Sequence, residues 1–179
     1  MGTAILIRHG DIERESGKPT DDLTPKAREY AKRLPHLLEK EGFSAGDIDI
    51  VYFDSSVKYV PSQQKKLQIK RCHETVKHIR GGPTHRSYRC SEIGSVLFSA
   101  QNAAKIIVIC YQSETLQAFP KVDSQKLSDF MTKDCPKDKG TVYEKPTDPL
   151  YEQILILDVT ASGLTNPRWV ATGTRKGEV

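Results

Sequence analysis

The run Ile106-Ile107-Val108-Ile109, within residues 105–110, is the most apolar stretch of the chain. β-Branched residues favour extended backbone, and a strand without polar alternation has to be buried on both faces. Such strands belong to parallel sheets that are covered by helices. We therefore predict the central strand of a covered sheet over residues 105–110. A second apolar run, residues 3–7, predicts another buried strand of the same kind.

Between these strands lies a well-marked helix. Thr24 is placed to cap it, and Pro25 occupies the first helical position, where a missing N–H costs nothing. Apolar residues then recur at helical spacing from Ala27 to Leu38 and end before Gly42. Pro35 lies inside this pattern and removes one backbone hydrogen bond, so we expect a kink there.

The remaining pattern alternates strands with helices. It predicts strands over 48–53, 153–159 and 169–172, helices over 67–79, 113–119 and 124–132, and loops over 11–22 and 133–149. This alternation favours an α/β protein, a three-layer α/β/α sandwich around a mostly parallel sheet. A chain of 179 residues suits a single domain, residues 1–179.

Composition excludes several classes of protein. The 27 Lys and Arg residues exceed the 23 Asp and Glu residues by only +4 and are spread along the chain, so we do not expect nucleic-acid binding. No apolar run approaches the roughly 18 residues of a membrane span, so no membrane association is expected. The four cysteines lack metal-ligand spacing. Reduced thiols in the cytoplasm, with no metal and no cofactor, are the simplest interpretation.

Polar residues follow three of the predicted strands, where an α/β sheet places its ligand site. Arg8-His9-Gly10 follows the first strand, Asp54-Ser55-Ser56 the second, and Tyr111-Gln112-Ser113 the central one. Ligands of open α/β sheets bind beyond the carboxyl ends of the strands. The three groups are therefore predicted to converge at one edge of the sheet.

Four segments, in this order, resemble the histidine phosphatase superfamily, which includes the phosphoglycerate mutases. They are residues 6–10 around Arg8-His9-Gly10, residues 23–31, Ser55-Ser56 with the later Arg71-Cys72-His73-Glu74-Thr75, and Ser113-Glu114-Thr115-Leu116. The resemblance covers residues 3–119 and implies a phosphoglycerate mutase-like fold and a phosphatase, that is, a hydrolase. Its substrate would be a phosphorylated small molecule or a phosphopeptide.

The resemblance also implies roles for individual residues. His9 would accept the phosphoryl group as a phosphohistidine, and Arg8 and Arg71 would clamp its oxygens with charged, planar donors. Glu92 would be the general acid, with Asp11 and Glu13 as weaker candidates. Substrate binding would fall to Gly10, Ser55, Tyr111, Gln112 and Ser113. The simpler alternatives are a structural histidine at 9, a solvated helix arginine at 71 and a surface glutamate at 92.

Two departures from the family pattern stand out. Tyr111-Gln112 replaces the Gly-His pair that ends the central strand in the family, and glutamine cannot carry a positive charge. Losing one positioned donor in such a site typically costs about 3–4 kcal/mol. A lysine-containing insertion, Val57 to Lys70, also separates Ser56 from Arg71. We predict that it forms either a solvated loop or a segment whose lysines select a strongly anionic substrate.

Three functional hypotheses remain open. The first is a slow or specialised phosphatase acting through His9. The second is a catalytically silent module that binds phosphorylated ligands or proteins. The third is an old phosphate site that now acts on an acidic metabolite. A glycolytic mutase is not expected, because the short spacing from His78 to Lys105 leaves little room for a substrate cap.

Overall fold

The computed structural model describes residues 1–112, 154–160 and 163–170. Its elements follow the chain in this order: β1 (Gly2–Arg8), β2 (Ile12–Glu15), β3 (Lys18–Leu23), α1 (Pro25–Lys40), β4 (Ile50–Asp54), β5 (Val57–Val60), η1 (Pro61–Gln63), β6 (Lys65–Gln68), α2 (Arg71–Val76), β7 (Thr84–Tyr88), η2 (Cys90–Glu92), α3 (Ile93–Phe98), η3 (Ala100–Asn102), β8 (Ile106–Tyr111), β9 (Ile154–Thr160) and β10 (Gly163–Val170).

A six-stranded sheet, in the order β10-β9-β1-β8-β4-β7, forms the centre of the molecule. Strands β1, β8, β4 and β7 are mutually parallel, whereas β9 and β10 run antiparallel to their neighbours. The apolar run of β8 therefore lies between two parallel strands, as predicted, and Ile107, Val108 and Ile109 are at most 1% exposed. Burial on both faces explains why this strand shows no polar alternation.

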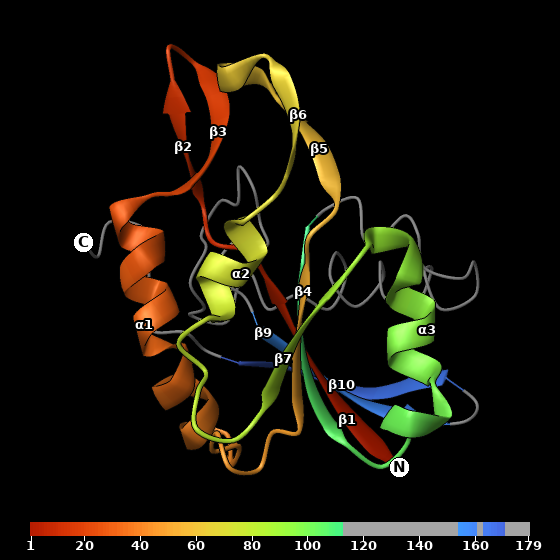
Figure 1. Cartoon of the computed structure of the whole chain (residues 1–179). Helices are drawn as coiled ribbons and strands as arrows, with labels where there is room; N and C mark the ends of the chain where they lie inside the picture. The colour runs from red at the N-terminus through yellow and green to blue at the C-terminus, as the bar shows by residue number, and fades with distance from the viewer. Residues whose placement is uncertain (113–153, 161–162, 171–179) are drawn as a thin grey trace.

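Helices cover both faces of the sheet (Figure 1). Ile5 and Ile7 of β1 pack with apolar residues of α1 and α2, whereas Ala4 and Leu6 face the cluster that contains α3. This alternation along one strand produces two cores, one on each side of the sheet. The described residues thus form the predicted three-layer α/β/α sandwich.

Helix α1 matches its sequence prediction closely. The Thr24 hydroxyl accepts a hydrogen bond from the Ala27 N–H at 3.1 Å, and Pro25 is the first helical residue. The helix continues through Pro35 and ends at Lys40. Its buried residues are those of the predicted apolar face: Ala27, Tyr30, Ala31, Leu34, Leu37 and Leu38.

Residues 11–22, predicted as a loop, instead form most of the hairpin β2–β3. Glu15 pairs with Lys18 across the two-residue turn Ser16-Gly17. Both turn residues have positive φ, 51° and 78°, and this left-handed backbone matches the twist of a tight hairpin. The loop prediction was wrong because the strands are largely polar and carry no apolar alternation.

The insertion between Ser56 and Arg71 is also ordered. It forms the hairpin β5–η1–β6, in which Lys58 pairs with Leu67 in register. The predicted helix over 67–79 is therefore wrong at its start, since Leu67 belongs to β6 and α2 spans only Arg71–Val76.

Strand β7 and helix α3 had no sequence prediction, and other predictions fall outside the described residues. Strand β7 is an edge strand whose mostly exposed side chains leave no apolar run, and α3 is only six residues long. The strand predicted over 153–159 is β9, and β10 begins before the predicted residue 169. The helices predicted over 113–119 and 124–132 and the loop over 133–149 lie outside the described residues.

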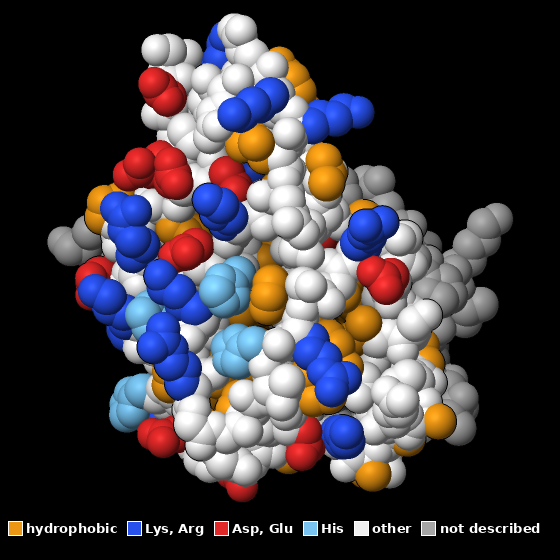
Figure 2. Space-filling model, in the orientation of Figure 1, with side chains coloured by type: hydrophobic (Ala, Val, Ile, Leu, Met, Phe, Trp, Pro, Cys, Tyr) orange, Lys and Arg blue, Asp and Glu red, His pale blue; other side chains and the backbone are white. Residues whose placement is uncertain are grey.

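The hairpins β2–β3 and β5–β6 stand together above the sheet and contact each other through β3 and β5 (Figure 1). On the face shown in Figure 2, basic side chains gather on the left, over α1 and α2, with acidic side chains among them. No helix among the described residues is both long enough and apolar enough to span a membrane.

Candidate functional site

His9 directly follows β1 at the carboxyl edge of the parallel strands. Its backbone N–H donates to the Tyr111 carbonyl at 3.1 Å, which continues the pairing of β1 with β8, and the residue is only 3% exposed. Its Nδ1 lies 2.7 Å from the Gly10 carbonyl oxygen. Because a carbonyl can only accept, Nδ1 carries the proton of the neutral ring and Nε2 carries the lone pair.

The surroundings of His9 keep its ring neutral. Burial lowers the pKa of His9 from 6.5 to about 3, against the opposing effect of its hydrogen bond to the Gly10 carbonyl. The positive charges of Arg71, Arg8 and Lys58 contribute smaller parts of this same downward shift of the pKa. The site therefore holds an unprotonated imidazole nitrogen inside a positive field, a combination suited to an anionic electrophile.

Gly10 fixes the loop that follows His9. Its N–H donates to the Thr75 hydroxyl at 2.9 Å, and that hydroxyl donates to the Arg71 carbonyl at 2.8 Å. A Cβ at position 10 would lie 2.7 Å from the Cβ of Ala27, closer than real contacts allow. Glycine is thus required where the end of β1 meets α1, and Thr75 ties the same point to α2.

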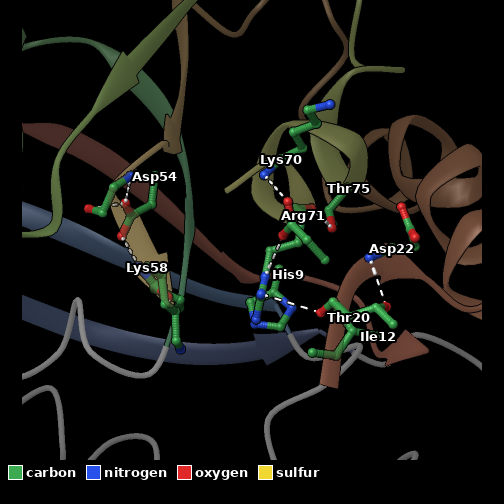
Figure 3. A network of polar contacts seen from close by, with 12 residues as sticks. His9, Ile12, Thr20, Asp22, Asp54, Lys58, Lys70, Arg71 and Thr75 are labelled. Carbon is green, nitrogen blue, oxygen red and sulfur yellow. Dashed lines mark hydrogen bonds and ion pairs between the residues drawn. The ribbon is translucent and has the colours of Figure 1, made fainter. Parts of the chain in front are cut away.

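Arg71, the first residue of α2, is 5% exposed and is held by the hairpin β2–β3. Its Nε donates to Asp21 Oδ1 at 2.8 Å, and its Nη2 lies 3.4 Å from the Thr20 carbonyl. The other oxygen of Asp21 accepts the Lys70 backbone N–H at 2.8 Å. In the close view of Figure 3, Arg71 lies beside His9, with Thr20 on one side and Lys58 and Asp54 on the other.

A second polar cluster joins β4, β5 and the end of β8. Asp54 is fully buried, and its Oδ1 accepts the backbone N–H of Ser56 at 2.9 Å and the Ser56 hydroxyl at 2.6 Å. Its Oδ2 lies 3.3 Å from Nε2 of Gln112. Oε1 of Gln112 in turn accepts from Lys58 Nζ, also at 3.3 Å. The side chains of Asp54, Gln112 and Lys58 are thus hydrogen-bonded in series, from the buried Asp54 carboxylate to the Lys58 ammonium group.

No protein-family model and no curated protein sequence matches the chain. Solved structures do match it. The protein histidine phosphatase SixA complexed with tungstate has a TM-score of 0.53 at 10% identity, covering 96% of this chain and 97% of that one. A candidate phosphohistidine phosphatase SixA from Agrobacterium tumefaciens has a TM-score of 0.52 at 14% identity, covering 88% and 91%. Phosphoglycerate mutase from Plasmodium falciparum has a TM-score of 0.52 at 12% identity, covering 97% and 92%. The chain has the histidine phosphatase fold.

Within this histidine phosphatase fold, most predicted site residues gather at one edge of the sheet. Arg8 is 7% exposed at the end of β1, and its charge and that of Arg71 both act on His9. Gln112 joins this group through Lys58, whose charge acts on the same ring.

Other predicted residues lie differently. The Tyr111 side chain belongs to the apolar core on the α3 side, so this residue serves His9 through its backbone carbonyl. Ser55 is half-buried, and its N–H donates to the Tyr88 carbonyl. Glu92 is exposed, and its carboxylate accepts the Arg89 N–H at the start of η2. Its role as a general acid stays a prediction. Ser113 lies outside the described residues.

Sequence reasoning missed Asp21 and gave Thr75 no role. Asp21 sits in a segment that was predicted as a loop, and no local pattern marks it as a partner of Arg71. Thr75 was noted only as part of a motif. Among the described residues, no group of metal-ligating side chains was found.

Proposed function

We propose that this protein is a phosphatase of the histidine phosphatase type, which hydrolyses a phosphomonoester or a phosphorylated peptide through a phosphohistidine at His9. The observation that carries the proposal is the state of His9: a buried, neutral ring whose Nδ1 donates to the Gly10 carbonyl, so that the proton is on Nδ1 and Nε2 is the basic nitrogen. The positive charges of Arg71, Arg8 and Lys58 around it would attract a phosphoryl group.

The reaction would proceed in two transfers. In the first, the Nε2 lone pair of His9 forms a bond to phosphorus while the bond to the leaving oxygen breaks, and that oxygen keeps the electron pair and takes a proton. In the second, water attacks phosphorus, gives its proton to the group that donated one in the first transfer, and displaces the imidazole, which recovers its lone pair. Arg8 and Arg71 would neutralise charge on the phosphoryl oxygens in both transition states. Glu92 is the proposed proton donor, which requires its carboxylate to leave the Arg89 N–H.

Two other expectations belong with this proposal. A phosphorylated small molecule or phosphopeptide is the proposed substrate class, and one similar structure holds tungstate, which is a tetrahedral oxyanion like phosphate. The cytoplasmic location, inferred from the cysteines, stays a prediction.

The test compares the wild type with His9→Ala on a small aryl phosphate. We expect His9→Ala to abolish turnover, and His36→Ala, which removes an exposed histidine of α1, to leave it unchanged. A quenched wild-type reaction should contain an acid-labile, base-stable phosphoenzyme that His9→Ala lacks. Turnover that persists in His9→Ala would exclude the proposed nucleophile. Vanadate binding without turnover in the wild type would instead support the silent binding module.

A further inference from the structure

We propose that Lys58 supplies the cationic group that the family's second histidine would otherwise provide at the position of Gln112, and that its ammonium group binds the phosphoryl oxygens together with Arg8 and Arg71. The inference rests on the proposed function, because it assigns a partner to the phosphoryl group at His9. It also explains what the insertion between Ser56 and Arg71 contributes, since this hairpin carries a cation to the site.

The alternation along β5 directs Lys58 inward. Val57 and Tyr59 are 66% and 51% exposed, whereas Val60 is completely buried. Lys58 is on the same side of the strand as Val60 and is half-buried. The hairpin thus turns this one lysine toward Gln112, while Lys65 and Lys66 on β6 remain exposed.

The buried carboxylate of Asp54 decides which end of Gln112 faces Lys58. A carboxylate only accepts hydrogen bonds, so the amide nitrogen of Gln112 must face Asp54, at 3.3 Å. The amide oxygen then points to the other side, where Lys58 Nζ approaches it at 3.3 Å. An amide oxygen facing a phosphoryl group would repel it, but Lys58 covers this oxygen with a positive charge. The cation that meets the substrate on this side is therefore Lys58.

The position of Lys58 suits a phosphoryl ligand at His9. Its charge acts on the His9 ring together with those of Arg71 and Arg8, so cations carried by β5, α2 and β1 all influence the same ring. An ammonium group has three donors and no acceptor, and a charge-assisted bond to phosphate is stronger than a bond to a neutral amide oxygen. We expect a phosphoryl oxygen to draw Nζ away from Gln112 when substrate binds.

The first test is a set of charge variants assayed with an aryl phosphate. Lys58→Met should lower kcat about 100-fold, within the range for one positioned donor, and change KM much less, because charge on the phosphoryl oxygens is greatest in the transition state. Lys58→Arg should retain most of the activity. Lys66→Met removes the same charge from the exposed side of the hairpin and should match the wild type.

The second test asks whether a histidine can replace the lysine. Gln112→His, placed in the Lys58→Met background, should recover at least about tenfold in kcat, a fraction of the effect of one donor. In the wild-type background, where Lys58 already supplies the charge, the same substitution should gain much less. Equal gains in both backgrounds would show that positions 58 and 112 act independently and would overturn the proposal.

Vanadate titration separates this inference from the proposed function. Lys58→Met should bind vanadate at least about tenfold more weakly than the wild type or Lys66→Met, with unchanged thermal unfolding. If His9-dependent turnover is present but Lys58→Met leaves both kcat and vanadate affinity intact, the role of Lys58 is refuted and the phosphatase stands. If no His9-dependent turnover is found, the phosphatase proposal fails, and the vanadate comparison alone decides whether Lys58 is an oxyanion ligand.

Discussion

At the scale of single residues, His9 owes its chemistry to burial. An exposed histidine is half protonated near pH 6.5, and a protonated Nε2 has no lone pair with which to attack phosphorus. Burial and three nearby cations lower the pKa of His9 to about 3, while the Gly10 carbonyl determines which nitrogen keeps the proton. The same burial that keeps the His9 ring neutral also makes the folded state sensitive to acid.

Stability should therefore fall as the pH drops from 6.5 toward 3. In this window the unfolded chain binds a proton at His9 and the folded chain does not, so acid favours unfolding, whereas above 6.5 this contribution is constant. The slope from this one group should approach about 1.4 kcal/mol per pH unit. Urea unfolding from pH 4.5 to 7.5 measures it. His73 and His78, whose pKa values burial also lowers, contribute in every variant, so the comparison with His9→Gln isolates His9. Identical slopes in the two proteins would contradict the assignment.

Gly10→Ala should cost stability and activity together. Its new Cβ would meet the Ala27 side chain at 2.7 Å, so the end of β1 must move away from α1. Overpacking of this kind typically costs about 1–3 kcal/mol. Gly46→Ala, where the nearest atom is Ser44 Oγ at 3.8 Å, is the matched control and should introduce no clash. Urea unfolding and the aryl phosphate assay check both variants. A Gly10→Ala protein as stable as the wild type would show that β1 and α1 can move apart at this contact without a loss of stability.

At the scale of elements, two polar hairpins build the site above an otherwise apolar sandwich. The β2–β3 hairpin brings Asp21 to Arg71, and the β5–β6 hairpin brings Lys58 to Gln112. Each hairpin therefore delivers one charged side chain to a residue at the carboxyl edge of the sheet. The helices and strands beneath them hold His9 and Gly10.

Asp21→Ala should be strongly destabilising, because it leaves the Arg71 guanidinium buried without its carboxylate. Removing one partner of a buried ion pair costs about 3–5 kcal/mol, whereas an exposed pair contributes under about 1 kcal/mol. The control is Glu29→Ala, which breaks the exposed pair of Lys32 and Glu29. Urea unfolding of both variants gives the comparison, and equal effects would mean that Arg71 finds another partner when Asp21 is removed.

At the scale of the whole molecule, the charge of the site is concentrated although the net charge is small. The chain carries only +4, but Arg8, Arg71 and Lys58 converge on one imidazole from three different elements. Long-range attraction from the rest of the surface should be weak, because the net charge of the chain is only +4. The affinity for oxyanions should therefore depend on these local charges.

Vanadate binding should consequently weaken only moderately with added salt. Buried charges are screened less than exposed ones, so the contributions of Arg8 and Arg71 should persist at high ionic strength, whereas that of the half-buried Lys58 should decline. Titrations at low and high NaCl should show a smaller salt effect for Lys58→Met than for the wild type. An equal or larger effect in the variant would mean that other surface charges dominate.

The sequence by itself determined strands β1 and β8, helix α1 and the place of His9 at the end of a strand. These features depend on local patterns: apolar runs in β1 and β8, the Thr24 cap with the periodic face of α1, and Arg8-His9-Gly10 directly after a strand. Parallel strands end at a common edge of the sheet. The proximity of His9 and Gln112 could therefore also be predicted, because each residue follows one of these strands.

Only the tertiary structure decided which side chains complete the site. Arg71 and Asp21 are 50 residues apart in the chain, and Lys58 and Gln112 are 54 apart. Neither hairpin has an apolar pattern that marks it as ordered, and no local rule states which lysine of the insertion turns inward. Those contacts arise because packing fixes the direction of β3 and β5 above the sheet. In addition, the buried carboxylates of Asp21 and Asp54 accept hydrogen bonds from Arg71 and Gln112, and so fix the orientation of these two side chains.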